Sequence, residues 1–132
     1  MTGDQREWIR ARAGARCEYC HLPDLALPPG DFHVEHIIAR QHRGDDHTDN
    51  LAWACMFCNL YKGPNLASID PDSGRLTPLF DPRRQIWDDH FRLEINQMAG
   101  RTDVGRTTVW LLEMNSEMMI KFRDLLIQEG LW

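Results

Sequence analysis

The sequence predicts an α+β fold, and three features of its 132 residues support this prediction. Short runs of β-branched and apolar residues, DFHVEHII and LAWAC, are typical of strands. Segments near both ends carry apolar residues at helical spacing. Two Cys-x-x-Cys pairs stand on either side of the predicted strands. We therefore expect a single domain, with a core at about residues 15–63 and a mostly helical C-terminal extension at about residues 64–132.

The N-terminal half contains helix, loop and strand signals in a clear order. QREWIRARAG predicts a short amphipathic helix that stops near Gly14. LPDLALPPGD is rich in proline and is expected to be a loop, because proline cannot sustain a helix. ARQHRGDDHTDN predicts a polar loop around Gly44, between the two strands. MFCNLYKG predicts a turn that continues into a short helix, with Gly63 as its stop.

The C-terminal half has a different character. DPDSGRLTPLFDPRR is rich in turn-forming residues, and WDDHFRLEINQMAGR predicts a strand or a hairpin. TTVWLLEMN and SEMMIKFRDLLIQEG then predict two helices, the second with Ser116 as its N-cap and Gly130 as its stop.

The four cysteines predict a structural zinc site. Cys17 and Cys20 form one Cys-x-x-Cys pair, and Cys55 and Cys58 form the other, which together supply the four sulfurs of a tetrahedral site. Two other interpretations stay open, namely small buried apolar side chains and redox-active dithiols. The expected role of zinc is to tie the N-terminal segment to the far end of the predicted hairpin.

The order C-x2-C, H-V-E-H-I-I, G-D-D-x-x-D-N-L, C-x2-C-N-x2-K over residues 17–63 resembles the HNH endonucleases. The resemblance implies a ββα-metal (His-Me finger) core, in which a hairpin and one helix surround a single divalent ion. It also implies hydrolysis of DNA phosphodiester bonds that leaves a 5′-phosphate and a 3′-hydroxyl. Residues from about 65 to 115 are similar, more loosely, to the extension of one bacterial subgroup of stand-alone HNH proteins.

The resemblance assigns roles to individual residues of this sequence. His36 would be the general base, a task that suits a neutral imidazole. Glu35 and Asn59 would bind the catalytic ion, Mg²⁺ or Mn²⁺, through oxygen atoms. Asn50 would brace the loop and hold the orientation of the histidine without touching the metal. Lys62 would contact a phosphate.

Three further residues are expected to bind substrate. His33 shares a strand face with Glu35, where it could grip phosphate or serve only as a structural histidine. Arg40 and Arg43 lie in the loop that would flank the substrate, either as phosphate contacts or as solvated loop residues.

Two features of the strand distinguish this sequence from the commoner family pattern. Glu35 stands where aspartate is more usual, and Ala39 stands where a proline often ends the strand. In an ideal strand, moreover, Glu35 and His36 point to opposite faces. They can therefore serve one phosphate only if the strand twists or ends there.

Charge and hydropathy limit the functions that the chain can perform. The net charge is −5, and residues 1–63 hold seven Lys and Arg against nine Asp and Glu, so long-range attraction to nucleic acid should be modest. The N-terminal residues lack an apolar signal segment, and no apolar run reaches the length of a membrane span, so we expect a cytoplasmic protein.

The sequence favours a metal-dependent DNA endonuclease, with RNA still open as a substrate. One alternative is a noncatalytic zinc module that binds nucleic acid or a protein partner. Another is a nuclease subunit whose specificity comes from a protein partner, which the low positive charge would suit.

Overall fold

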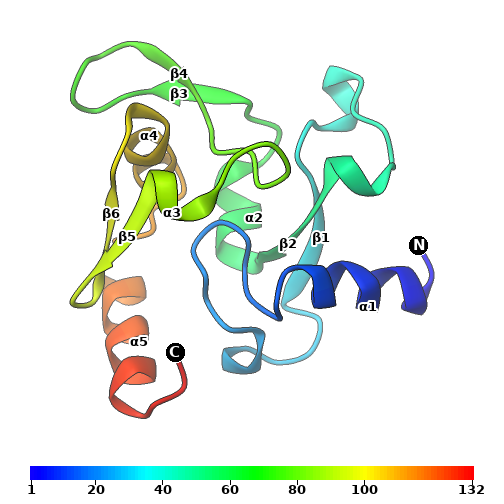
Figure 1. The fold of residues 1–132 in the computed structure, drawn as a ribbon, viewed down its shortest axis with the longest axis horizontal. Coiled ribbons are helices and arrows are strands. Elements are labelled where there is room, and N and C mark those ends of the chain that lie inside the picture. Colours follow the sequence, from blue (N-terminus) through cyan, green and yellow to red (C-terminus); the bar gives the residue numbers. More distant parts are fainter. The chain divides into compact units, whose positions relative to one another are not determined.

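The computed structural model describes all 132 residues, which form two compact units, Met1–Pro64 and Asn65–Trp132 (Figure 1). The division falls one residue after the predicted start of the extension. Whether both units act as one domain stays a prediction. No helix in either unit combines the length and apolar character that crossing a bilayer requires.

The first unit begins with α1 (Gly3–Arg12), which the sequence predicted. Thr2 and Gln5 form a capping box, each side chain bonding to the other residue's backbone N–H, so the first turn of the helix is well satisfied. The helix ends just before Gly14, whose φ of +67° is unfavourable for residues with a side chain. α1 packs against the second strand of this unit through the buried side chain of Ile9.

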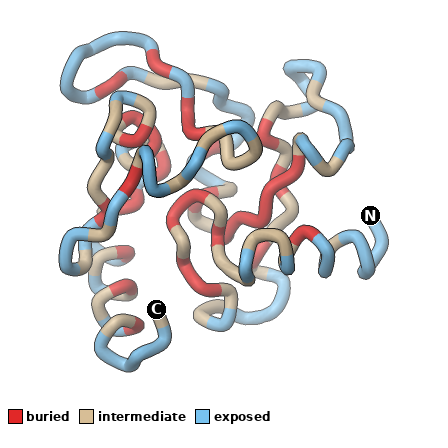
Figure 2. Tube along the Cα trace, viewed as in Figure 1, coloured by how far each residue is buried: buried red, intermediate tan, exposed pale blue.

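The predicted strands form an antiparallel hairpin of β1 (Phe32–His36) and β2 (Leu51–Cys55), followed directly by α2 (Met56–Lys62). Every residue of β2 is buried (Figure 2), because α1 and α2 both pack against it. This coverage explains why LAWAC is apolar throughout instead of alternating. α2 ends at Gly63, as predicted, with φ +50°.

The loop between the strands is held close to the end of β1. It contains two short 3₁₀ turns, at Arg40–His42 and Thr48–Asn50. Gly44 lies so close to the backbone that a Cβ atom there would overlap the carbonyl group of Ile38. Only glycine therefore allows the polar loop to fold back onto the strand.

The second unit contains two small hairpins and three helices. The helices are α3 (Trp87–His90), α4 (Asp103–Leu111) and α5 (Glu117–Gln128). The hairpins pair β3 (Ala67–Ile69) with β4 (Leu76–Pro78), and β5 (Phe91–Glu94) with β6 (Gln97–Gly100).

The C-terminal predictions hold for some of these elements and fail for others. The second hairpin and both long helices were predicted, including the Ser116 N-cap, which accepts a hydrogen bond from the Met119 N–H. The β3–β4 hairpin was not predicted. The extension is therefore mixed rather than mostly helical. The chain as a whole has the mixed helix and strand content of the predicted α+β class, with three two-stranded antiparallel sheets.

Candidate functional site

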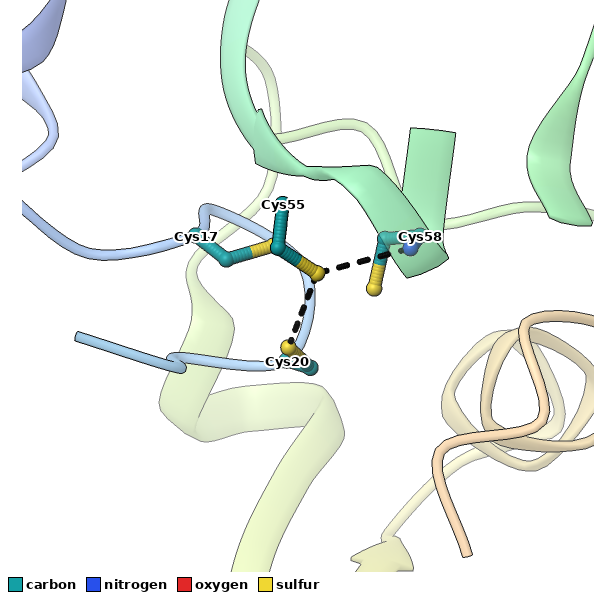
Figure 3. Close-up of side chains that lie close together, drawn as sticks. All are labelled: Cys17, Cys20, Cys55 and Cys58. Atoms are coloured by element: carbon teal, nitrogen blue, oxygen red, sulfur yellow. Dashed lines mark hydrogen bonds between the residues drawn. The ribbon is translucent and has the colours of Figure 1, made fainter. Parts of the chain in front are cut away.

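The four cysteines meet in one buried cluster of the first unit (Figure 3). Their sulfur atoms all lie within 4.8 Å of one another, and the Cys20 and Cys55 sulfurs are 3.8 Å apart. A tetrahedral zinc site with bonds of about 2.3 Å has sulfur–sulfur edges of about 3.8 Å, whereas a disulfide bond is only about 2.05 Å long. The cluster therefore has the donor set and the spacing to hold a zinc ion.

Backbone contacts explain why the two cysteine pairs come together. The turn at Cys17–Cys20 is closed by hydrogen bonds between Cys17 and its neighbours Leu22 and His21. Glu18 then joins this turn to β2, because its N–H donates to the Trp53 carbonyl and its carboxylate accepts from the Trp53 N–H, at 2.8 Å each. The first turn thus lies against the strand whose last residue is Cys55.

The thiols do not share protons equally. Burial acts to raise the pKa of Cys17, but hydrogen bonds from Cys20, Cys55 and Cys58 lower it well below its usual value. Hydrogen bonds to Cys17 raise the pKa values of Cys20 and Cys58. Metal binding requires deprotonated thiols, so a lowered thiol pKa in the cluster favours the capture of a cation.

Glu35 lies on the buried side of β1. Its Oε2 accepts a hydrogen bond of 2.7 Å from the Tyr19 hydroxyl, and its Oε1 is 2.5 Å from the Lys62 ammonium. Burial raises the pKa of Glu35, while the charge of Lys62 and the hydrogen bonds from Lys62 and Tyr19 oppose this shift. Burial and the Glu35 hydrogen bond raise the pKa of Tyr19 well above its usual value.

Lys62 completes this arrangement from α2. Its side chain is only 2% exposed, and its ammonium also donates to the Ile37 carbonyl at 2.9 Å. Glu35 and Lys62 therefore neutralise each other in the interior. The predicted phosphate contact of Lys62 and the predicted metal contact of Glu35 both stay predictions, since neither group faces the groove that contains His36.

His36 follows Glu35 in β1 but lies in different, partly exposed surroundings. Its Nε2 is 2.7 Å from Asp46 Oδ1, and Arg40 Nη2 is 3.0 Å from the same oxygen. The hydrogen bonds from His36 and Arg40 lower the pKa of Asp46. With its side chain 27% exposed, His36 lines a groove of about 800 Å³ together with His33 and Arg40.

The two asparagines have different surroundings. Asn50 Oδ1 accepts from the Ile38 N–H at 2.9 Å, and its Nδ2 donates to the carbonyls of Ile38 and Asp45. These three bonds tie the loop to the end of β1 next to His36. Asn59 is half-buried in α2, and its side-chain amide makes no hydrogen bond within the protein.

The structure thus divides the predicted site residues between two places. It brings His33, His36 and Arg40 into one groove, although alternation along the strand predicted His33 on the face of Glu35, and it buries Glu35 and Lys62 outside that groove. Arg43 is exposed at φ +70° and does not line the groove.

Two groove residues with charged side chains were not predicted. Asp46 stands ten positions from the histidine that it contacts. Arg6 belongs to a helix that no motif connects to this site.

Fold and site together define a protein of mixed helix and strand, with a buried four-cysteine cluster that can hold a metal ion and a separate groove lined by histidine and arginine. Residues 17–65 match the family model described as HNH endonuclease, which supports the resemblance found in the sequence. A search of curated proteins and a search of solved structures each returned no significant match.

Proposed function

We propose that the protein is a metal-dependent endonuclease that hydrolyses DNA phosphodiester bonds, with zinc bound by the four cysteines for structure. The observation that carries this proposal is the position of His36. Within the HNH segment, it is oriented by Asp46 and flanked by Arg40 and His33 in an open groove. The expected products carry a 5′-phosphate and a 3′-hydroxyl, as the family resemblance implies.

The contacts of His36 indicate how it would act. Nε2 of the His36 ring is hydrogen-bonded to Asp46, so Nδ1 is the ring nitrogen that would remove a proton from the attacking water. A carboxylate behind a histidine also stabilises the charge that the ring gains on protonation. Arg40 and His33 line the same groove and would bind the phosphate that is attacked, and Asn50 holds the loop that carries Asp46.

The catalytic ion is the part of the proposal that fits the structure least well. Asn59 has a free amide oxygen, but the Glu35 carboxylate is already neutralised by Lys62 and bonded to Tyr19. As arranged, these residues do not form a site for Mg²⁺ or Mn²⁺. Its place in the proposal rests on the family resemblance and on the metal dependence that the experiment measures.

Plasmid cleavage tests the proposed activity. The zinc-loaded protein is incubated with supercoiled plasmid and either Mg²⁺ or Mn²⁺, and relaxed and linear products are measured over time. Loss of a general base costs about 10² to 10⁴ in rate, so His36→Ala should lose nearly all cleavage. His42→Ala is the matched control, because His42 is exposed and does not line the groove. Equal cleavage by His36→Ala and the unaltered protein would refute the assigned base.

The buried Glu35–Lys62 pair favours one alternative, a noncatalytic zinc module that binds nucleic acid or a protein partner. A carboxylate held by lysine in the interior is an ordinary stabilising arrangement and needs no metal. This alternative predicts binding of DNA or RNA without cleavage in either metal. The same plasmid experiment, extended to single-stranded DNA and RNA, therefore separates the two functions.

A further inference from the structure

The groove that contains His36 has a second wall, formed by α1, which lies outside the segment that matches the HNH family. Arg6 is the one arginine of α1 that lines the groove, whose lining also includes His33 and His36. We propose that Arg6 binds a backbone phosphate next to the one that is cut, so that α1 holds the substrate strand across His36. This inference rests on the proposed function, since it deepens the same site.

Arg6 is held in a defined position by two contacts. Its Nη2 donates to the Phe32 carbonyl at 2.8 Å, and its guanidinium carbon lies 4.6 Å from the centre of the Trp53 ring. Stacking on an aromatic face and one backbone bond fix the plane of the group without using its other donors. The guanidinium therefore keeps free N–H groups in an orientation that is set before any ligand arrives.

Arg6 also lies where two hollows meet. The groove of about 800 Å³ contains His36 and Arg40, and a neighbouring hollow of about 910 Å³ contains Arg10 and Phe32. Arg6 and His33 line both of them. An extended strand that passes His36 can therefore continue past Arg6, with successive phosphates on the two residues.

Charge pairing distinguishes Arg6 from the other arginines of these hollows. Arg40 is paired with Asp46, and Arg10 is paired with Asp24 at 2.6 Å. Arg6 has no carboxylate partner, although it is half-buried over a tryptophan. The Arg6 guanidinium is thus oriented and lacks a counter-ion within the protein, although the net charge of the chain is −5. A phosphate of a nucleic-acid backbone would supply that counter-ion.

Binding measurements test Arg6 separately from cleavage. Fluorescein-labelled duplex DNA is titrated with zinc-loaded protein in a His36→Ala background, and anisotropy is read between about 50 and 200 mM NaCl. Arg6→Gln should weaken binding about tenfold, as expected for a charge-assisted hydrogen bond. Arg6→Gln should also reduce the magnitude of the slope of log K for binding against log salt concentration by about 0.9, the value expected for the loss of one phosphate contact. The affinity of Arg6→Lys should lie between those of the parent protein and Arg6→Gln. A lysine ammonium keeps the charge but cannot bond to the Phe32 carbonyl and to a phosphate with the fixed geometry of a guanidinium.

Lys121→Gln supplies the control. It removes the same charge from a side chain that is 76% exposed in the second unit, and it should leave affinity and slope unchanged. Thermal melting checks that each variant is folded. Unchanged affinity and slope in Arg6→Gln would overturn the proposal, and so would a lack of binding to duplex DNA, single-stranded DNA and RNA.

Cleavage kinetics separate this inference from the proposed function. In this proposal Arg6 contacts a neighbouring phosphate and not the phosphate that is cut, so Arg6→Gln should raise KM with little change in kcat. If neither the unaltered protein nor Arg6→Gln cleaves DNA, but Arg6→Gln still weakens binding, the endonuclease proposal fails and the Arg6 contact stands. If the unaltered protein cleaves and Arg6→Gln has the same KM, the Arg6 contact fails and the endonuclease proposal stands.

Discussion

Glu35 and Lys62 show that the place of a residue in a sequence motif does not determine its environment in the fold. Both were predicted as polar site residues, and both are almost completely buried. Glu35 is one of the two buried residues of β1, and α2 packs against this strand, so the two charges meet away from solvent. Such a pair is tolerated because each group supplies the other's counter-charge, with Tyr19 bonding the carboxylate.

Removing one partner of this pair should therefore be costly. Lys62→Met leaves the Glu35 carboxylate buried without its cation, and we expect the free energy of unfolding to fall by about 3–5 kcal/mol. The double variant Glu35→Gln/Lys62→Met keeps an acceptor for Tyr19 and buries no charge, so it should recover most of this loss. Urea denaturation measures both. A single variant as stable as the unaltered protein would show that Glu35 is not desolvated.

At the scale of elements, the first unit is a short hairpin with helices on both sides, and its cysteine turn is attached through Glu18 and Trp53. The hairpin has only two strands, which are marginally stable alone. The cysteine cluster joins the turn, the end of β2 and the start of α2 at one point. A metal there would connect all three elements.

Metal analysis should accordingly find about one zinc per chain. Chelation, or the substitution Cys58→Ser, should lower the melting temperature and the near-ultraviolet signal of the first unit, because bound metal contributes directly to folding. Adding zinc back should restore the chelated protein but not the variant. A zinc-free protein that melts at the same temperature would rule out the structural site.

At the scale of the whole chain, acidic residues outnumber basic ones, and their environments decide which of them matter for stability. In the second unit, Asp70 is fully buried and receives two hydrogen bonds from Arg106, at 2.9 and 3.2 Å. Arg106, and then the Asp72 N–H and the Ser73 hydroxyl, hold the pKa of Asp70 well below its ordinary value of 3.8. The pKa of Arg106 is raised in return, first by its bonds to Asp70.

A lowered carboxyl pKa stabilises the folded state above the unfolded pKa and ceases to do so as pH falls. Stability should therefore be constant near neutrality and should decline as the pH falls below the ordinary value of 3.8. Asp70→Asn should lose stability at neutral pH and flatten this acid decline, as followed by thermal melts. Asp88→Asn, at an exposed position, should leave the decline unchanged. An equally steep decline in Asp70→Asn would assign the acid sensitivity to other groups.

Elements whose pattern is local were predicted correctly. The helical spacing and stop signals of α1, α2, α4 and α5 are contained in short segments, and so are the apolar runs of β1 and β2. The β3–β4 hairpin was missed because its strands have three residues each around DPDSG, which reads only as a turn. Strands that short are stabilised by contacts with α4, which lies far along the chain.

The sequence was enough to identify the HNH segment, the four cysteines that cluster and most of the helices and strands, because spacing along the chain encodes each of them. The grouping of the polar site residues was not encoded in that way. Burial paired Glu35 with Lys62, loop folding brought Asp46 to His36, and packing of α1 placed Arg6 in the groove. Each of these contacts joins residues at least 10 positions apart, so they arise only when the chain has folded.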